Sequence, residues 1–182
     1  MTDTGIIRRI DELGRVVIPK EIRRKMRIKE GDPVEFYTNS NELILKKYSP
    51  ITGLKEIAKS VADGVSEETA KTCIVVDNNA VVCVGRNKNK ELVGKEISQE
   101  LFKMLCERKS SIINRADMEN ATPITQGEEQ PFENLVIVPI VALGDCYGGI
   151  ILADNDKGSR FTMTELRYLN LASKLISGQL ED

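Results

Sequence analysis

TGIIRRIDELGRVVIPKEIRRKMRIKEGDPVEFY, residues 4–37, is the stretch that decides the fold of the first part of the chain. Two runs rich in β-branched residues, at 4–10 and 15–19, flank the polar turn DELG and predict two short strands. Pro19 fixes the backbone for a helix start, so a helix is predicted over 20–28, where apolar side chains recur one turn apart. The order strand, turn, strand, helix is therefore expected within this stretch.

The next residues predict a hairpin. Strands are expected at 33–37 and 42–48, joined by the polar turn 38–41. A unit of about 45 residues with such short strands needs a disulfide, a metal or a second chain to complete its core. Residues 1–50 contain neither cysteine nor histidine, so we expect an obligate dimer. Its core is expected to draw on seven apolar residues: Ile6, Ile10, Val16, Ile18, Phe36, Leu43 and Leu45.

The net charge of −2 conceals an asymmetry. Residues 1–50 contain 11 Lys/Arg and 8 Asp/Glu, a net charge of +3, whereas residues 51–182 contain 15 and 20, a net charge of −5. Between Arg8 and Lys29 there are nine basic side chains, six of them arginine, against three acidic ones. Because a guanidinium group is shaped to pair with a phosphate or a guanine edge, this segment is a candidate nucleic-acid surface.

The quoted stretch, together with ILKKY at 44–48, resembles the AbrB family of bacterial swapped-hairpin DNA-binding domains. The block DELGRVVIP followed by EIRR carries most of that likeness. The resemblance implies that hairpins from two chains interleave into one β-barrel dimer. It also implies double-stranded DNA as the partner, with arginines as the main contacts. Carried over residue by residue, the contacts are Arg8, Arg15, Arg23 and Arg24, and the candidate set also includes Arg9 and Lys20.

A different pattern begins at Ser49. This residue suits a helix N-cap, Pro50 follows in the first turn, and apolar residues then recur at helical spacing. These features predict a helical linker over 50–71, which separates a first domain, 1–49, from a second, 72–182.

The second domain is predicted to combine strands and helices. The apolar hairpin LVIVPIVALGDCYGGIILAD at 135–154 resembles part of a GAF domain, a fold in which a six-stranded antiparallel sheet lies between helices. One helix is expected around Leu101, and another begins at the N-cap Thr162, where Glu165 completes a capping box. The long polar segment 116–134 is typical of a lid, a binding loop or a disordered segment. Further strands are expected at 72–77, 80–85 and 110–114.

The domain order, the KKYSPI junction at 46–51 and the chain length resemble a family of sporulation transcription factors from endospore-forming bacteria. The expected fold class is α+β: a swapped-hairpin barrel dimer followed by a GAF-like α/β domain with a central antiparallel sheet. The resemblance implies a cytoplasmic regulator, associated with the nucleoid of the forespore, that activates some genes and represses others. It further implies a tetramer in which GAF-domain helices join two swapped-hairpin dimers.

Composition excludes several kinds of chemistry. The chain has no histidine, which removes Ser-His-Asp and Cys-His nucleophiles and histidine-ligated zinc or haem. Its four cysteines, at 73, 83, 106 and 146, form no C-x-x-C pair and are expected to be reduced thiols, with Cys106 the most accessible. We therefore predict no enzymatic activity, no metal and no cofactor. The start of the chain shows no signal sequence and the longest apolar run, 135–143, is too short to span a bilayer, so no membrane partner is expected.

Two other functions stay open at this stage. Swapped-hairpin domains also occur in antitoxins, which carry a short toxin-binding tail in place of a folded domain. The second domain would instead be purely a ligand-binding sensor if it held a small-molecule effector. No fingerprint identifies such a ligand, because GRNKNKELVGK at 85–95 departs from a P-loop at Asn89.

Overall fold

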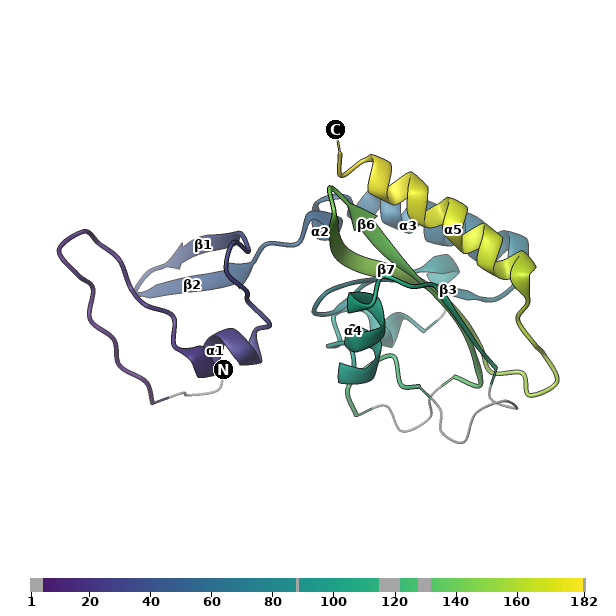
Figure 1. Cartoon of the computed structure of the whole chain (residues 1–182), viewed down its shortest axis with the longest axis horizontal. Coiled ribbons are helices and arrows are strands. Elements are labelled where there is room, and N and C mark those ends of the chain that lie inside the picture. The colour runs from purple at the N-terminus through teal and green to yellow at the C-terminus, as the bar shows by residue number, and fades with distance from the viewer. Residues whose placement is uncertain (1–4, 88, 115–121, 128–131, 182) are drawn as a thin grey trace. The chain divides into compact units, whose positions relative to one another are not determined.

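The computed structural model is shown in Figure 1. The chain divides into two compact units, residues 1–48 and 49–182, which are described separately. The structure describes residues 5–87, 89–114, 122–127 and 132–181.

The first unit consists of a short helix and a hairpin. Helix α1 (Lys20–Lys25) begins directly after Pro19, as predicted, but ends three residues early because Arg27 takes a left-handed conformation with φ of 53°. Strands β1 (Val34–Asn39) and β2 (Glu42–Lys47) pair in antiparallel fashion. The hairpin predicted from the sequence is therefore confirmed.

A small polar network ties the end of α1 to this hairpin. The Nζ of Lys47 donates to the main-chain oxygen of Arg27 at 2.7 Å and lies 2.8 Å from the Oδ2 of Asp32. The main-chain N–H of Lys29 donates to the same carboxylate at 2.9 Å. Burial would raise the pKa of Asp32, but the hydrogen bonds from Lys47 and Lys29 outweigh it and hold the pKa below its usual value. The charged carboxylate of Asp32 thus helps to hold the segment that follows α1 against strand β2.

The strands predicted at 4–10 and 15–19 do not form in the single chain. Residues 5–10 and 16–19 carry no strand assignment, and among residues 5–48 only Pro19 is buried. A strand requires a neighbouring strand to take up its main-chain hydrogen bonds, and the described part of this unit offers only the hairpin β1–β2. Apolar side chains consequently face solvent, among them Ile7, Ile10, Val17, Phe36 and Leu43.

The second unit is built on a five-stranded sheet in the order β4-β3-β7-β6-β5, with every pair antiparallel. The resemblance led us to expect six strands; the described residues form five. The strands otherwise lie where the sequence predicts them, and β6 and β7 form the expected hairpin. Their bounds are β3 Thr72–Asp77, β4 Val81–Val84, β5 Ser111–Asn114, β6 Asn134–Ala142 and β7 Asp145–Asp154.

Helices cover both faces of this sheet. Helices α3 and α5 lie side by side on one face and α4 lies on the other (Figure 1). The helices are α2 (Pro50–Gly53), α3 (Lys55–Thr69), α4 (Gln99–Cys106) and α5 (Met163–Gly178), with short 3-10 turns η1 (Gly85–Asn87) and η2 (Lys90–Leu92).

Side-chain caps explain where three of these helices begin. Ser49 accepts from the N–H of Thr52 at the start of α2, as the sequence predicts. Ser98 caps α4 in the same way. At α5 the predicted capping box is present, since Thr162 accepts from the helix main chain and the carboxylate of Glu165 accepts from the N–H of Thr162 at 2.8 Å.

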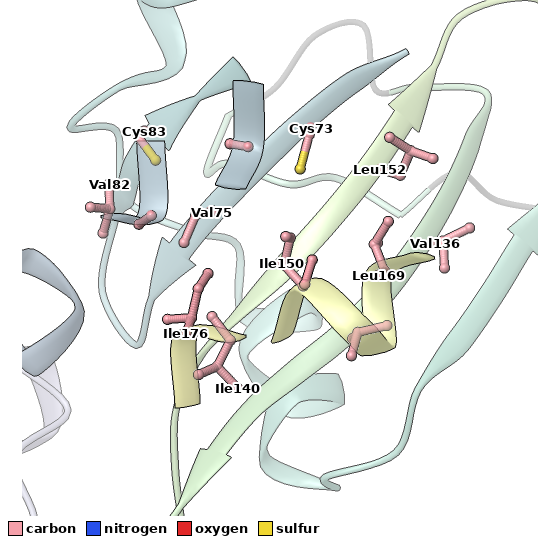
Figure 2. Close-up of a cluster of buried hydrophobic side chains, with 14 of the residues drawn as sticks. Cys73, Val75, Val82, Cys83, Val136, Ile140, Ile150, Leu152, Leu169 and Ile176 are labelled. Atoms are coloured by element: carbon pink, nitrogen blue, oxygen red, sulfur yellow. The ribbon is translucent and has the colours of Figure 1, made fainter. Parts of the chain in front are cut away.

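The side chains of β3, β6 and β7 alternate between two apolar cores. Cys73 and Val75 point to the α3/α5 side, whereas Ile74 and Val76 point to the α4 side. Because both faces are covered, these strands appear in the sequence as continuous apolar runs. Figure 2 shows the α3/α5 core, in which side chains of the sheet meet Leu169 and Ile176 of α5.

The predicted linker 50–71 is helical, and its buried residues belong to the second unit. Ile51 of α2 and Ala58 and Ala62 of α3 are fully buried in the α3/α5 core. The predicted loop 116–134 lies partly outside the described residues. Its described segment 122–127 packs against the α4 side, where Ile124 is fully buried.

Two of the four cysteines are core residues. Burial raises the pKa of the Cys83 thiol to about 11 and raises that of Cys73 further, so neither is a reactive thiolate at neutral pH. Cys106 is exposed on α4, as expected, and Cys146 is half-buried. Cys73 and Cys83 therefore contribute packing to the sheet, and the predicted accessibility of Cys106 is confirmed.

An ion pair closes the edge of the α3/α5 core. Lys71, between α3 and β3, bonds the carboxylate of Asp154 at the end of β7. Burial would raise the pKa of Asp154, but the bonds from Lys71 and Ser159 outweigh it and hold the pKa below its usual value. The carboxylate therefore stabilises the folded unit above the unfolded pKa of about 3.9, and this stabilisation is lost as pH falls through the lower, folded pKa.

Replacing Lys71 with methionine should expose this contribution. We expect K71M to lower the free energy of unfolding at neutral pH by about 1.5–3 kcal/mol, the value of a hydrogen bond to a charged group. The gap to the wild type should narrow only once pH falls below the unfolded pKa of about 3.9, and it should close below the lower, folded pKa of Asp154, where the carboxyl is protonated in both proteins. Urea unfolding followed by circular dichroism measures both quantities. The control is K157M, which removes a lysine that is 84% exposed and lies 3.7 Å from Glu133, and which should change the stability little. A stability difference between K71M and the wild type that does not change with pH would contradict the assigned ion pair between Lys71 and Asp154.

Candidate nucleic-acid interface

All six basic residues predicted to contact DNA are exposed in the first unit: Arg8, Arg9, Arg15, Lys20, Arg23 and Arg24. The structure places them on three local elements. Arg8 and Arg9 lie in the extended segment 5–10, Arg15 lies at the end of a turn, and the other three lie on α1.

Helix α1 presents two of its arginines for a simple geometric reason. Ile22 and Met26, one turn apart, are the partly buried side of the helix. Arg23 and Arg24 follow Ile22 directly and project away from that side, in the last turn of the helix. Basic groups are favoured there because the helix dipole places negative charge at its C-terminal end. Lys20 occupies the first turn and is also exposed.

The turn 11–15 holds Arg15 by a direct ion pair. The Nε of Arg15 donates to the Oδ2 of Asp11 at 2.8 Å. Within residues 5–48, Arg15 is the one candidate of the six for which the structure gives an ion pair. Arg8 makes only a local hydrogen bond, from its Nη1 to the main-chain oxygen of Ile7 at 3.3 Å. The sequence analysis did not single out Asp11; the D-x-x-G-R spacing of residues 11–15, a turn with aspartate at its start, was the available signal.

A second surface that the sequence analysis missed lies on α5. Its buried side consists of Leu169, Ala172 and Ile176, which pack into the α3/α5 core. A separate row of exposed residues recurs at alternating spacings of four and three, the a/d pattern of helices that pack against one another. We call this row the α5 seam; it consists of Thr164, Tyr168, Leu171, Leu175 and Gly178. Leu171 and Leu175 are 61% and 55% exposed.

Other kinds of site receive no support from the described residues. Across residues 5–87, 89–114, 122–127 and 132–181, no group of His, Cys, Asp or Glu side chains is arranged to hold a metal ion. None of the helices in the described part of the chain is both long and apolar enough to cross a bilayer.

Comparison with known families assigns both parts of the chain. The family described as Stage V sporulation protein T C-terminal, transcription factor, matches residues 53–181. The family described as antidote-toxin recognition MazE, bacterial antitoxin, matches residues 7–52.

Individual proteins give the same division. The chain is 36% identical over 184 residues to stage V sporulation protein T of Bacillus subtilis (strain 168). The aligned region covers 100% of this chain and 99% of that protein. The transition state regulatory protein AbrB of the same strain is 56% identical over 50 residues, 28% of this chain and 52% of AbrB. The resemblance of the first domain to the AbrB family is thereby confirmed.

The second unit matches a GAF domain in fold. The GAF domain of Acinetobacter phosphoenolpyruvate-protein phosphotransferase superposes with a TM-score of 0.57 at 16% identity, covering 69% of this chain and 80% of that domain. This likeness confirms the predicted GAF-like fold and says nothing of activity. Because the relationship to the Bacillus subtilis protein extends over the full chain, the chain belongs to the stage V sporulation protein T family of transcription factors.

Proposed function

We propose that this chain is a sequence-specific, double-stranded-DNA-binding regulator of sporulation genes, acting on chromosomal DNA in the cytoplasm of the forespore as both activator and repressor. The observation that carries the proposal is the exposure of all six candidate basic side chains on a unit with a net positive charge. Phosphate contacts from such side chains supply most of the affinity of proteins for DNA, and arginine adds contacts to base edges.

The DNA-binding form is proposed to be a swapped-hairpin dimer. Segments 5–10 and 16–19 have the composition of strands and expose apolar side chains, yet a single chain gives them no partner strand among the described residues. Pairing with a second copy would satisfy their main-chain groups and cover those side chains. It would also duplicate every arginine about a two-fold axis, which matches the symmetry of paired DNA half-sites.

The α5 seam supports assembly of two such dimers into a tetramer. A soluble helix whose inner side is already packed gains nothing from a second row of exposed leucines unless another helix covers it. The four-three spacing of the seam suits packing against a copy of itself. Linking two DNA-binding dimers would raise the effective concentration of the second dimer at DNA without adding any contact.

The described residues favour assembly over ligand sensing as the role of the second unit. Both faces of its sheet carry apolar side chains packed beneath helices, and these form two hydrophobic cores. Neither core identifies a binding site for a small-molecule effector. We propose no enzymatic activity and no cofactor.

An antitoxin role is the second candidate, because residues 7–52 match a family described as a bacterial antitoxin. The second unit speaks against it. In place of a short tail, the chain continues into a five-stranded sheet with helices on both faces. Purification of the native protein with a small ribonuclease-like partner would revive this candidate.

Removing single arginines tests the interface. In R23A and R24A we expect affinity for duplex DNA to fall about tenfold or more, and the slope of log K against log salt to shrink by about 2. That slope change arises because each residue occurs twice in a dimer and each phosphate contact contributes about 0.9. Gel-shift titrations over a range of salt concentrations measure both.

The control for these variants is K157A, which removes one exposed positive charge from the second unit. It should leave affinity and slope nearly unchanged. Equal affinities for R23A, R24A and K157A would show that α1 does not contact DNA.

Acidic residues on the α5 seam test the assembly. The double variant L171E/L175E should convert tetramers to dimers, because like charges would face one another across the seam. Sedimentation velocity measures the mass directly. The matched control is L143E, which places the same substitution on a leucine that is 72% exposed in the β6–β7 turn. Monomers in place of dimers would contradict the swapped-hairpin pairing, and unchanged tetramers would contradict the seam.

A further inference from the structure

The turn 11–15 is closed almost entirely by Asp11. Its Oδ1 accepts from the N–H of Leu13 at 3.0 Å and from the N–H of Arg15 at 2.8 Å. Its own main-chain N–H donates to the oxygen of Arg15 at 3.0 Å, and its oxygen accepts from Gly14 at 3.0 Å. Gly14 has a φ of +75°, which favours glycine. The position of Arg15 is thus set by a turn that Asp11 organises.

The second oxygen of the same carboxylate reaches the side chain of Arg15. Oδ2 accepts from Nε at 2.8 Å, although the arginine side chain is 71% exposed. Within the described residues of this unit, neither Nη group of Arg15 makes a hydrogen bond or an ion pair. A guanidinium held at Nε keeps both Nη groups available, and these form the fork that pairs with a phosphate or with the O6 and N7 of guanine.

The negative charge of Asp11 opposes DNA binding, so its presence beside Arg15 calls for a structural explanation. The hydrogen bonds from the main chain and side chain of Arg15 hold the pKa of Asp11 below its usual value, so the group stays charged at neutral pH. A negative charge beside a DNA contact repels phosphates and weakens binding to any sequence. The neighbouring Glu12, also exposed, carries the same charge without a hydrogen bond to Arg15.

We infer that Asp11 is a positioning residue for DNA recognition: it holds Arg15 in one orientation before DNA arrives, and so sets sequence preference at the expense of general affinity. The inference rests on the proposed DNA-binding function. A long, exposed arginine otherwise loses its conformational freedom on binding, which weakens the complex. An arginine fixed in advance avoids that loss only where a phosphate or base edge lies in the matching place.

The test compares D11N with E12Q. Both variants remove one negative charge, but asparagine keeps the Oδ1 acceptor for the turn and replaces Oδ2 by an amide that cannot accept from Nε. The probes are a duplex enriched from a random-sequence pool by the wild-type protein and a scrambled duplex of the same length and composition. E12Q should bind both duplexes more tightly by the same factor. D11N should lose roughly tenfold in the ratio of the two affinities, as two arginines per dimer become unrestrained.

A double-mutant cycle separates positioning from a structural role. In an R15A background, D11N should tighten binding to both duplexes by the same factor, as E12Q does. It should no longer change the ratio of the two affinities, because its effect on preference acts through Arg15. A loss of preference that persists in the R15A background would assign Asp11 a structural role and overturn the inference. Equal preference for the enriched duplex in D11N and the wild type would overturn it as well. If the wild-type protein itself binds the two duplexes equally, the proposed sequence-specific function fails and the inference fails with it.

Discussion

Two six-residue strands and a helix of less than two turns cannot enclose an interior, and this constraint governs the first unit. Among residues 5–48 only Pro19 is buried, while isoleucine, valine, phenylalanine and leucine side chains face solvent. The apolar surface needed for stability has to come from a second chain. In the proposed dimer, folding, pairing and the presentation of arginines become one event, and the proposed DNA-binding surface takes on the two-fold symmetry of the pairing.

The second unit meets the opposite condition. Its sheet is covered on both faces, and the alternation along β3, β6 and β7 supplies two cores at once. Helix α5 can therefore use one side for its own core and still present a second apolar row outward. A unit that is stable alone is suited to joining copies, because its surface can evolve contacts without loss of the fold. On the proposed assembly, the chain combines a first unit that needs a second copy to cover its apolar side chains with a second unit that has its own two cores.

Most elements could be predicted from the sequence because their signals are local. Pro19 marks the start of α1, Thr162 and Glu165 mark α5, and apolar runs locate the strands of the sheet. The strands predicted at 4–10 and 15–19 are absent from the described residues of the single chain, since strand formation depends on a partner outside the local sequence. The helical linker was predicted as a helix, but periodicity does not say what covers its apolar side, which proved to be the core of the second unit. The basic candidates followed from composition and resemblance, whereas the contact from Asp11 to Arg15 depends on a turn geometry that charge counting hides.

The turn 11–15 also has a consequence for how this sequence can change over time. Asp11, Gly14 and Arg15 share one set of hydrogen bonds and one left-handed backbone position. Substitutions among them are therefore coupled: after one is lost, the others no longer contribute what they did, and their effects do not add. If Arg15 contacts DNA as proposed, selection on that contact also acts on Asp11 and Gly14, which hold it in place. The shared hydrogen bonds therefore predict that Asp11, Gly14 and Arg15 change together and not one at a time.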